Sequence, residues 1–89
     1  MITDAQMRAA RALLAIDQRQ LAELTGLSLP TIQRMEASRG VVRGNVDSLM
    51  KLVTALHDAG IELIAEGAAS SGSGRGVRLI HPKAREPRT

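Results

Sequence analysis

The sequence predicts a mainly α-helical fold, with four helices in residues 1–60 and a β-hairpin in residues 61–80. Apolar residues recur at helical spacing through the first 60 residues, and two capping-box patterns and a glycine divide them into separate helices. Alternating apolar residues in IELIAE and GVRLI, residues 61–66 and 76–80, predict the two strands. At 89 residues the chain is near the lower size limit for a domain with one apolar core, so we expect partner chains to add to its stability.

The first helix is predicted to begin after Thr3 and to run to about Ala15. Thr3 and Gln6 form a capping box, in which each side chain accepts a hydrogen bond from a backbone N–H at the start of the helix. Such a helix packs one apolar stripe on the rest of the domain. The side chains expected in this stripe are Ala5, Ala9, Ala10, Leu13 and Leu14.

Asp17 and Gln20 repeat the capping box, so a second helix is predicted from Gln18 to Thr25. Gly26 then supplies the positive φ that ends a helix sharply. Ser28 caps a third helix, whose first turn tolerates a proline because its N–H groups have no partner within the helix. The side chains expected to close the core between these two helices are Leu21, Ala22, Leu27, Ile32 and Met35.

Residues 38–45, SRGVVRGN, are predicted to form a loop rich in glycine and arginine. Asn45 caps a fourth helix, which runs from about Val46 to Ala59 and ends at Gly60. This helix is expected to complete the core. The apolar residues assigned to core packing here and on the second helix are Leu24, Val46, Leu49, Met50, Leu52, Val53 and Leu56.

The predicted hairpin carries apolar residues on both faces, and a two-stranded sheet is only marginally stable alone. We therefore hypothesise that the hairpins of two protomers pair into one intermolecular sheet and form a two-fold dimer, because strand edges favour such pairing. The alternative is that the hairpin packs on its own fourth helix. The residues expected at the dimer interface are Ile61, Leu63, Ile64, Val77, Leu79 and Ile80. Residues 81–89, HPKAREPRT, are interpreted as a disordered basic tail.

Composition excludes several classes of function. The chain has no cysteine, and its two histidines lie in different segments, so no metal site and no cofactor are expected. The absence of Phe, Tyr and Trp removes the stacking platforms that bind single-stranded nucleic acid. No apolar run reaches the roughly 20 residues of a membrane span, and we expect a cytoplasmic protein. No nucleophile with a paired base is evident, so an enzyme is not expected.

The charges are unevenly distributed along the chain. Lys51 is outnumbered in residues 46–66 by Asp47, Asp58, Glu62 and Glu66, whereas residues 18–45 and 67–89 have an excess of arginine and lysine. Positive charge is therefore expected on particular surfaces, as in proteins that bind polyanions. The alternative is an ordinary solvated face with a basic tail.

The pattern Gln18-x-x-Leu21-Ala22-x-x-x-Gly26-Leu27-Ser28-x-x-Thr31-Ile32-x-x-x-Glu36 resembles the helix-turn-helix signature of the Cro and phage-repressor-like (Xre-like) transcriptional regulators. The resemblance covers roughly residues 5–59, about two thirds of the chain. It implies a four-helix, repressor-like domain for residues 1–60. In that family the third helix enters the major groove of double-stranded DNA and the second lies across the backbone.

The resemblance also implies contacts for individual residues. Those expected to face the bases are Leu29, Pro30, Gln33 and Arg34, with Arg34 pairing with guanine, Gln33 with adenine and Leu29 with a thymine methyl group. Gln18, at the start of the second helix, matches the phosphate-contacting glutamine of the family. The other residues that we expect to contact phosphates are Ser28, Thr31, Arg39 and Arg43. Arg11 and Glu36 match a pair that forms a partly buried salt bridge in some relatives. For Thr31, Gln33 and Arg34 the alternative is an ordinary surface role.

The function expected from this resemblance is that of a dimeric transcriptional regulator, in particular a repressor, that binds a pseudo-palindromic operator. The alternative is an antitoxin that neutralises a toxin protein and uses the same helices to control its own operon. Residues 67–89 favour the antitoxin alternative, because a flexible segment can fold against a partner protein. A toxin gene beside this one distinguishes the two.

Overall fold

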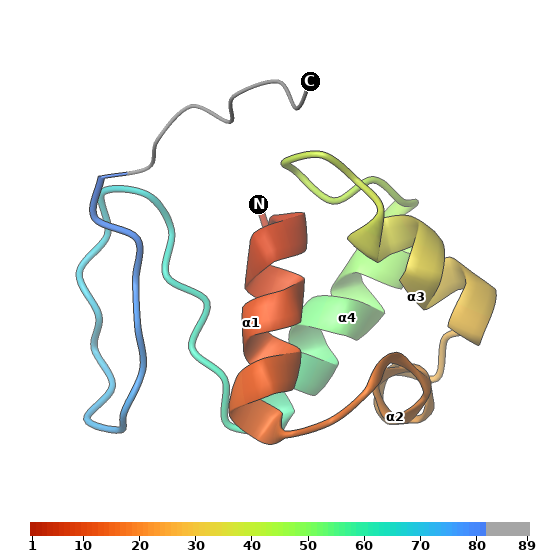
Figure 1. Ribbon diagram of the computed structural model, residues 1–89, viewed down its shortest axis with the longest axis horizontal. Coiled ribbons are helices and arrows are strands. Elements are labelled where there is room, and N and C mark those ends of the chain that lie inside the picture. The colour runs from red at the N-terminus through yellow and green to blue at the C-terminus, as the bar shows by residue number, and fades with distance from the viewer. Residues whose placement is uncertain (82–89) are drawn as a thin grey trace, which may run out of the picture.

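The computed structural model describes residues 1–81, which contain four helices (Figure 1). These are α1 (Asp4–Leu14), α2 (Gln18–Thr25), α3 (Leu29–Glu36) and α4 (Val46–Asp58). The predicted mainly α-helical class is confirmed. Each helix begins where its cap predicted, and α1, α2 and α4 end within one residue of their predicted ends. Within the described residues, no helix is both long enough and apolar enough to cross a membrane. Residues 82–89 of the predicted tail lie outside the described part of the chain.

Local side-chain caps determine where the helices begin. Thr3 Oγ1 accepts a hydrogen bond from the Gln6 N–H at 3.2 Å, and Asp17 Oδ1 accepts one from the Gln20 N–H at 2.8 Å. The side-chain oxygens of both glutamines accept bonds from the backbone in return, so both predicted capping boxes are present. Ser28 and Asn45 cap α3 and α4. Each cap satisfies N–H groups that the helix itself leaves without an acceptor.

The core contains buried residues from every helix, from the segment before α1 and from the loop after α3. Its buried apolar residues are Ile2, Met7, Ala10, Leu21, Ala22, Ile32, Met35, Val42, Leu52 and Leu56. The stripe predicted for α1 is partly wrong, because Ala5 and Ala9 face solvent and Leu13 is 54% exposed. Met7 is fully buried in their place. The spacing Met7–Ala10–Leu14 defines the inward face of α1, and Leu13 lies beside that face.

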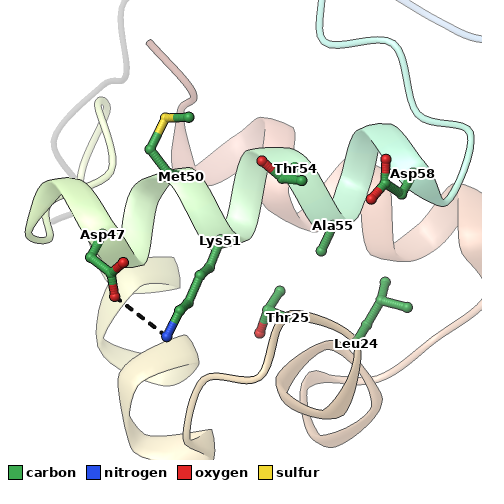
Figure 2. Close-up of a pocket in the computed structure, with 8 residues that line it drawn as sticks. All are labelled: Leu24, Thr25, Asp47, Met50, Lys51, Thr54, Ala55 and Asp58. Carbon is green, nitrogen blue, oxygen red and sulfur yellow. Dashed lines mark ion pairs between the residues drawn. The ribbon is translucent and has the colours of Figure 1, made fainter.

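Four further apolar residues predicted for the core, on α2 and α4, are also exposed. Leu24 and Met50 are 47% and 58% exposed and line a pocket between α2 and α4 (Figure 2). Val46 and Val53 on α4 are 76% and 36% exposed. α4 therefore carries two apolar stripes. The inward stripe is Leu49, Leu52 and Leu56, and the other stripe faces solvent.

The loop after α3 is fixed to the N-terminal segment. The Asp4 N–H donates to the Gly40 carbonyl at 2.9 Å and the Val42 N–H donates to the Ile2 carbonyl at 3.0 Å, which gives an antiparallel bridge between Thr3 and Val41. Ile2 and Val42 are 5% and 2% exposed. The loop that was expected to be irregular is therefore anchored in the core at its centre.

The predicted β-hairpin is not seen, because residues 61–80 contain no strand. This segment turns away from α4 and runs along the side of α1 opposite to α2 and α3 (Figure 1). Gln6 Nε2 donates to the Ile64 carbonyl at 3.1 Å, and Arg78 donates to the Ala65 and Ala68 carbonyls. Side chains thus bond the carbonyls that a sheet would use. Because an isolated two-stranded sheet is only marginally stable, these side-chain hydrogen bonds can replace its strand pairing.

The Glu62 side chain bonds residues 70–72, further along the same segment. Its carboxylate accepts hydrogen bonds from the hydroxyls of Ser70 and Ser71 and from the N–H groups of Ser71 and Gly72, at 2.6 to 3.3 Å. The Ser70 hydroxyl and then the Ser71 N–H stabilise the ionised carboxylate and lower its pKa from 4.5 to about 2. Glu62 therefore holds residues 70–72 close to its own position in the chain.

We expect the contact between Glu62 and residues 70–72 to be lost in acid. Because the folded-state pKa of Glu62 is below its unfolded value, its carboxylate stabilises this contact fully above pH 4.5 and loses the effect as the pH falls towards 2. An NMR titration of the Ser71 and Gly72 amide signals should therefore show a transition well below pH 4.5. Glu62→Gln should remove the transition. A midpoint near 4.5 in the unaltered chain would contradict the contact.

Candidate nucleic-acid interface

The turn between α2 and α3 is short and fixed by hydrogen bonds. Gly26 ends α2 with a φ of 74°, and its N–H donates to the Ala22 carbonyl at 2.9 Å. A Cβ at Gly26 would meet no atom within 4 Å, so glycine is required by the backbone angle and not by space. The Thr25 hydroxyl donates to the Ala22 carbonyl and accepts from the Leu27 N–H. These contacts fix the point from which α3 begins.

α3 presents a polar face to solvent. Ile32 and Met35 are buried against the other helices, as predicted, while Pro30, Gln33 and Arg34 are exposed. Arg34 forms no ion pair within residues 1–81, so its guanidinium group is available to a ligand. Leu29 differs from the sequence-based interpretation, because it is half-buried and packs on the core. Less of the Leu29 side chain is therefore exposed to contact a thymine methyl group than was predicted.

Four of the five residues predicted to contact phosphates fall into two groups. Ser28 and Thr31 lie at the start of α3, where the Ser28 hydroxyl donates to the Thr31 hydroxyl at 2.8 Å and accepts from the Thr31 N–H. This arrangement leaves the Thr31 hydroxyl proton for another acceptor. Arg39 and Arg43 lie exposed in the loop after α3 and form no ion pair with any described residue. The anchored loop therefore carries two arginines beside α3.

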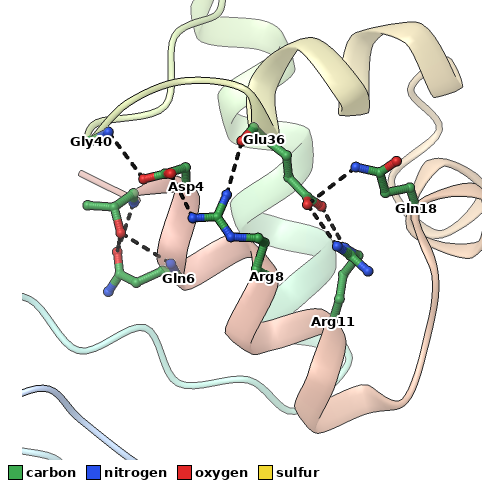
Figure 3. A network of polar contacts seen from close by, with 8 residues as sticks. Asp4, Gln6, Arg8, Arg11, Gln18, Glu36 and Gly40 are labelled. Carbon is green, nitrogen blue, oxygen red and sulfur yellow. Dashed lines mark hydrogen bonds and ion pairs between the residues drawn. The ribbon is translucent and has the colours of Figure 1, made fainter. Parts of the chain in front are cut away.

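A polar network joins α1 to the end of α3 (Figure 3). Arg11 donates from Nε to Glu36 Oε2 at 2.6 Å and from its terminal nitrogen to Oε1 at 2.8 Å. Glu36 is 5% exposed and Arg11 21% exposed in their side chains. The hydrogen bonds to Glu36 raise the pKa of Arg11 above its usual value. Gln18 Nε2, predicted to contact a phosphate, donates to Glu36 Oε1 at 3.3 Å.

A second arginine in the network, Arg8, was not predicted to have a role. It donates to Asp4 at 2.8 Å and to the Glu36 backbone carbonyl at 3.1 Å, and Asp4 accepts the Gly40 N–H (Figure 3). Burial opposes the ionisation of Asp4, but the bonds from Arg8 and Gly40 outweigh it and hold its pKa below the usual value. The i, i+4 spacing of Asp4 and Arg8 is the sequence signal for this pair. Nothing in the sequence indicates the bond from Arg8 to the Glu36 backbone carbonyl.

The exposed charges separate into two regions. Arg11 neutralises Glu36 inside the domain, so Glu23 is the exposed carboxylate of residues 18–45. The exposed arginines of the same segment are Arg19, Arg34, Arg39 and Arg43. α4 instead exposes Asp47 and Asp58. Residues 18–45 thus expose four arginines and one carboxylate, so positive charge is concentrated in this part of the chain.

The residues predicted to form a dimer interface are divided by the structure. Ile61, Leu63 and Ile64 are partly buried, and the first two pack on the core of their own chain. Val77, Leu79 and Ile80 are 84%, 76% and 74% exposed. The structure thus leaves only the C-terminal half of the predicted set open to a partner.

Comparison of the chain with protein-family models, curated proteins and solved structures finds no match.

Proposed function

We propose that this protein is a prokaryotic, cytoplasmic transcriptional regulator that binds double-stranded DNA in a sequence-specific manner, with α2 and α3 as its helix-turn-helix. The observation that carries this proposal is the exposed face of α3. Gln33 and Arg34 are exposed on it, and the loop that follows exposes Arg39 and Arg43; none of these arginines forms an ion pair with a described residue. The resemblance to Xre-like regulators in residues 18–36 supports the same assignment. An α-helix with such a face fits the major groove of B-DNA.

The proposed reading face consists of Pro30, Gln33 and Arg34. Arg34 pairs with guanine O6 and N7, and Gln33 pairs with adenine N6 and N7. Pro30 is the exposed apolar residue at the start of α3 and takes the thymine methyl contact first assigned to Leu29. Leu29 then supports the position of α3 from beneath.

The proposed phosphate contacts surround this face. Thr31 donates its hydroxyl proton, and Arg39 and Arg43 bind the backbone from the loop after α3. Gln18 binds from the start of α2, where unpaired N–H groups favour an anion. Its bond to Glu36 positions the side chain for this contact. Ser28 contributes by orienting the Thr31 hydroxyl.

The proposed regulator acts as a dimer on a pseudo-palindromic operator. One α3 helix covers only a few base pairs, and two-fold symmetry places a second α3 in the next major groove, about 34 Å away. A regulator of this kind represses by covering a promoter. No cofactor is required for this activity.

Binding of the purified chain to DNA from upstream of its own gene, compared with scrambled DNA, tests the proposal. The unaltered chain should prefer the upstream DNA, and Arg34→Ala should remove most of this preference. A bidentate arginine contributes about 1–3 kcal/mol, so a dimer that loses two such contacts should bind at least thirtyfold more weakly. Arg75→Ala, at an exposed site away from α3, is the matched control. Equal binding by unaltered chain and Arg34→Ala would contradict the role of α3.

A second candidate function is supported by the exposed apolar residues Val77, Leu79 and Ile80. An antitoxin that binds a toxin protein through this segment would bury them, as coupled folding and binding does elsewhere. This candidate predicts that the product of an adjacent gene forms a stable complex with the chain and that Leu79→Asp prevents it. The α3 face is not involved in that complex, so Arg34→Ala should leave it intact.

A further inference from the structure

The loop after α3 carries Arg39 and Arg43, and hydrogen bonds to other residues determine the course of its backbone. The Gly40 N–H donates to Asp4 Oδ1 at 3.1 Å, and the Asp4 N–H donates to the Gly40 carbonyl at 2.9 Å. The Arg43 N–H donates to Ser38 Oγ at 3.1 Å. Because Arg39 directly precedes Gly40, both arginines begin from backbone that is held in place.

A buried carboxylate and one guanidinium group connect this loop to the end of α3 (Figure 3). Asp4 is 3% exposed, and its Oδ2 accepts a bond from Arg8 at 2.8 Å while its Oδ1 accepts the bond from Gly40. Arg8 also donates to the backbone carbonyl of Glu36, the last residue of α3, at 3.1 Å. We call Asp4 and Arg8 the loop latch. The latch joins α1, the end of α3 and the loop through adjacent hydrogen bonds.

We propose that the loop latch positions Arg39 and Arg43 for their phosphate contacts, so that Asp4 and Arg8 are positioning residues for DNA binding. Asp4 is buried and negatively charged, so it acts through the loop and not by binding a phosphate itself. A loop that is already held in one conformation loses less conformational freedom when it binds, and its affinity is higher for that reason. The inference rests on the proposed function and names residues outside the DNA-binding face that this function needs.

The geometry supports a positioning role beyond a role in folding. Val42 is 2% exposed and its N–H bonds the Ile2 carbonyl, so the loop is anchored in the core without the latch. The bond from Asp4 to Gly40 adds a second anchor, directly beside Arg39. Loss of this second anchor should release the backbone at Arg39 and Gly40, while the helices remain packed.

The variant Asp4→Ala separates positioning from charge, because the two effects have opposite signs. It removes one negative charge from a chain of net charge +3, so a purely electrostatic effect would strengthen DNA binding. Loss of the latch should instead weaken binding to upstream DNA at least about fivefold. Asp58→Ala removes the same charge from an exposed site on α4 and should bind at least as tightly as the unaltered chain. Circular dichroism should show unchanged helix content in both variants.

A double-mutant cycle tests whether Asp4 acts through the loop arginines. In a chain that carries Arg39→Gln and Arg43→Gln, the further change Asp4→Ala should weaken DNA binding by less than about twofold, because the side chains that it positions are absent.

Gly40→Ala disturbs the loop without changing α1 or the net charge. Gly40 has a φ of 106°, and a Cβ there would meet no atom within 4 Å, so alanine strains only the backbone. This variant should weaken DNA binding as Asp4→Ala does, and it replaces Asp4→Ala if that variant fails to fold.

Three results would overturn the positioning role. These are DNA binding by Asp4→Ala as tight as that of Asp58→Ala, an equal loss from Asp4→Ala with and without the loop arginines, and unchanged binding by Gly40→Ala. Failure of the proposed function gives a different pattern, in which the unaltered chain shows no preference for upstream DNA and Arg34→Ala has no effect. That pattern removes the positioning role as well, whereas the three results above leave the proposed function in place.

Discussion

Replacing Arg11 with methionine is expected to lower the free energy of unfolding by about 3 kcal/mol, because it leaves the Glu36 carboxylate buried without its cation. Glu36 would keep one bond, from Gln18 at 3.3 Å. We take the lower end of the usual range because Arg11 is 21% exposed and water can partly replace it. For a chain of this size, such a loss corresponds to a fall in Tm of about 12 to 24 °C.

Thermal and urea unfolding of Arg11→Met, Glu36→Leu and the double variant distinguish a buried ion pair from a surface contact. The double variant should recover much of the lost stability, because no unpaired buried charge remains. Arg19→Met, which changes an exposed arginine with no ion pair among the described residues, should alter stability by less than about 0.5 kcal/mol. An unchanged Tm for Arg11→Met would show that the pair does not stabilise the fold.

The helices could be predicted from the sequence because their start and stop signals are local. Thr3, Asp17, Ser28 and Asn45 each act on N–H groups within three residues, and the structure contains all four caps. Gly26 likewise ends α2 through its own backbone angle. Signals of this kind depend little on the rest of the chain.

Contacts between distant segments could not be predicted in the same way. Val42 was expected in an irregular loop, yet it is buried by pairing with Ile2, 40 positions earlier, as its N–H donates to the Ile2 carbonyl. The alternating pattern of residues 61–66 indicated a strand. Gln6 bonds the Ile64 carbonyl and Glu62 binds residues 70–72, so side chains of this segment and of α1 compete with strand pairing. No periodicity in the sequence encodes these contacts.

In the candidate site too, features set by local spacing could be predicted and those set by contacts between distant segments could not. The exposure of Gln33 and Arg34 follows from helical spacing once Ile32 and Met35 are placed in the core. The burial of Leu29 does not, because it depends on how closely α3 approaches its neighbours. The internal pairing of Arg11 with Glu36 matters most for the proposed function, because it removes an acidic side chain from the surface that carries the proposed DNA contacts.

A steep dependence on salt is the second large effect we expect. Exposed arginines on the α3 side have only Glu23 as an exposed acidic neighbour in residues 18–45, whereas acidic Asp47 and Asp58 lie on α4. A dimer that contacts about 6 phosphates releases their counterions, so its affinity for DNA should fall about a thousandfold between 50 and 200 mM salt. Binding isotherms at four salt concentrations give the slope directly.

The variant Arg43→Gln tests whether this salt dependence arises from phosphate contacts at the proposed DNA-binding face. The substitution removes one phosphate contact per protomer, and two per dimer, so the loss of affinity over the same salt range should be about tenfold smaller. Arg75→Gln removes the same charge from an exposed site outside this face and should leave the slope unchanged. Equal slopes for Arg43→Gln and Arg75→Gln would mean that the chain attracts DNA through its net charge of +3 and not through the loop beside α3. A reduced slope for Arg43→Gln alone, with the preference for upstream DNA retained, would separate phosphate contacts in the loop from base contacts on α3.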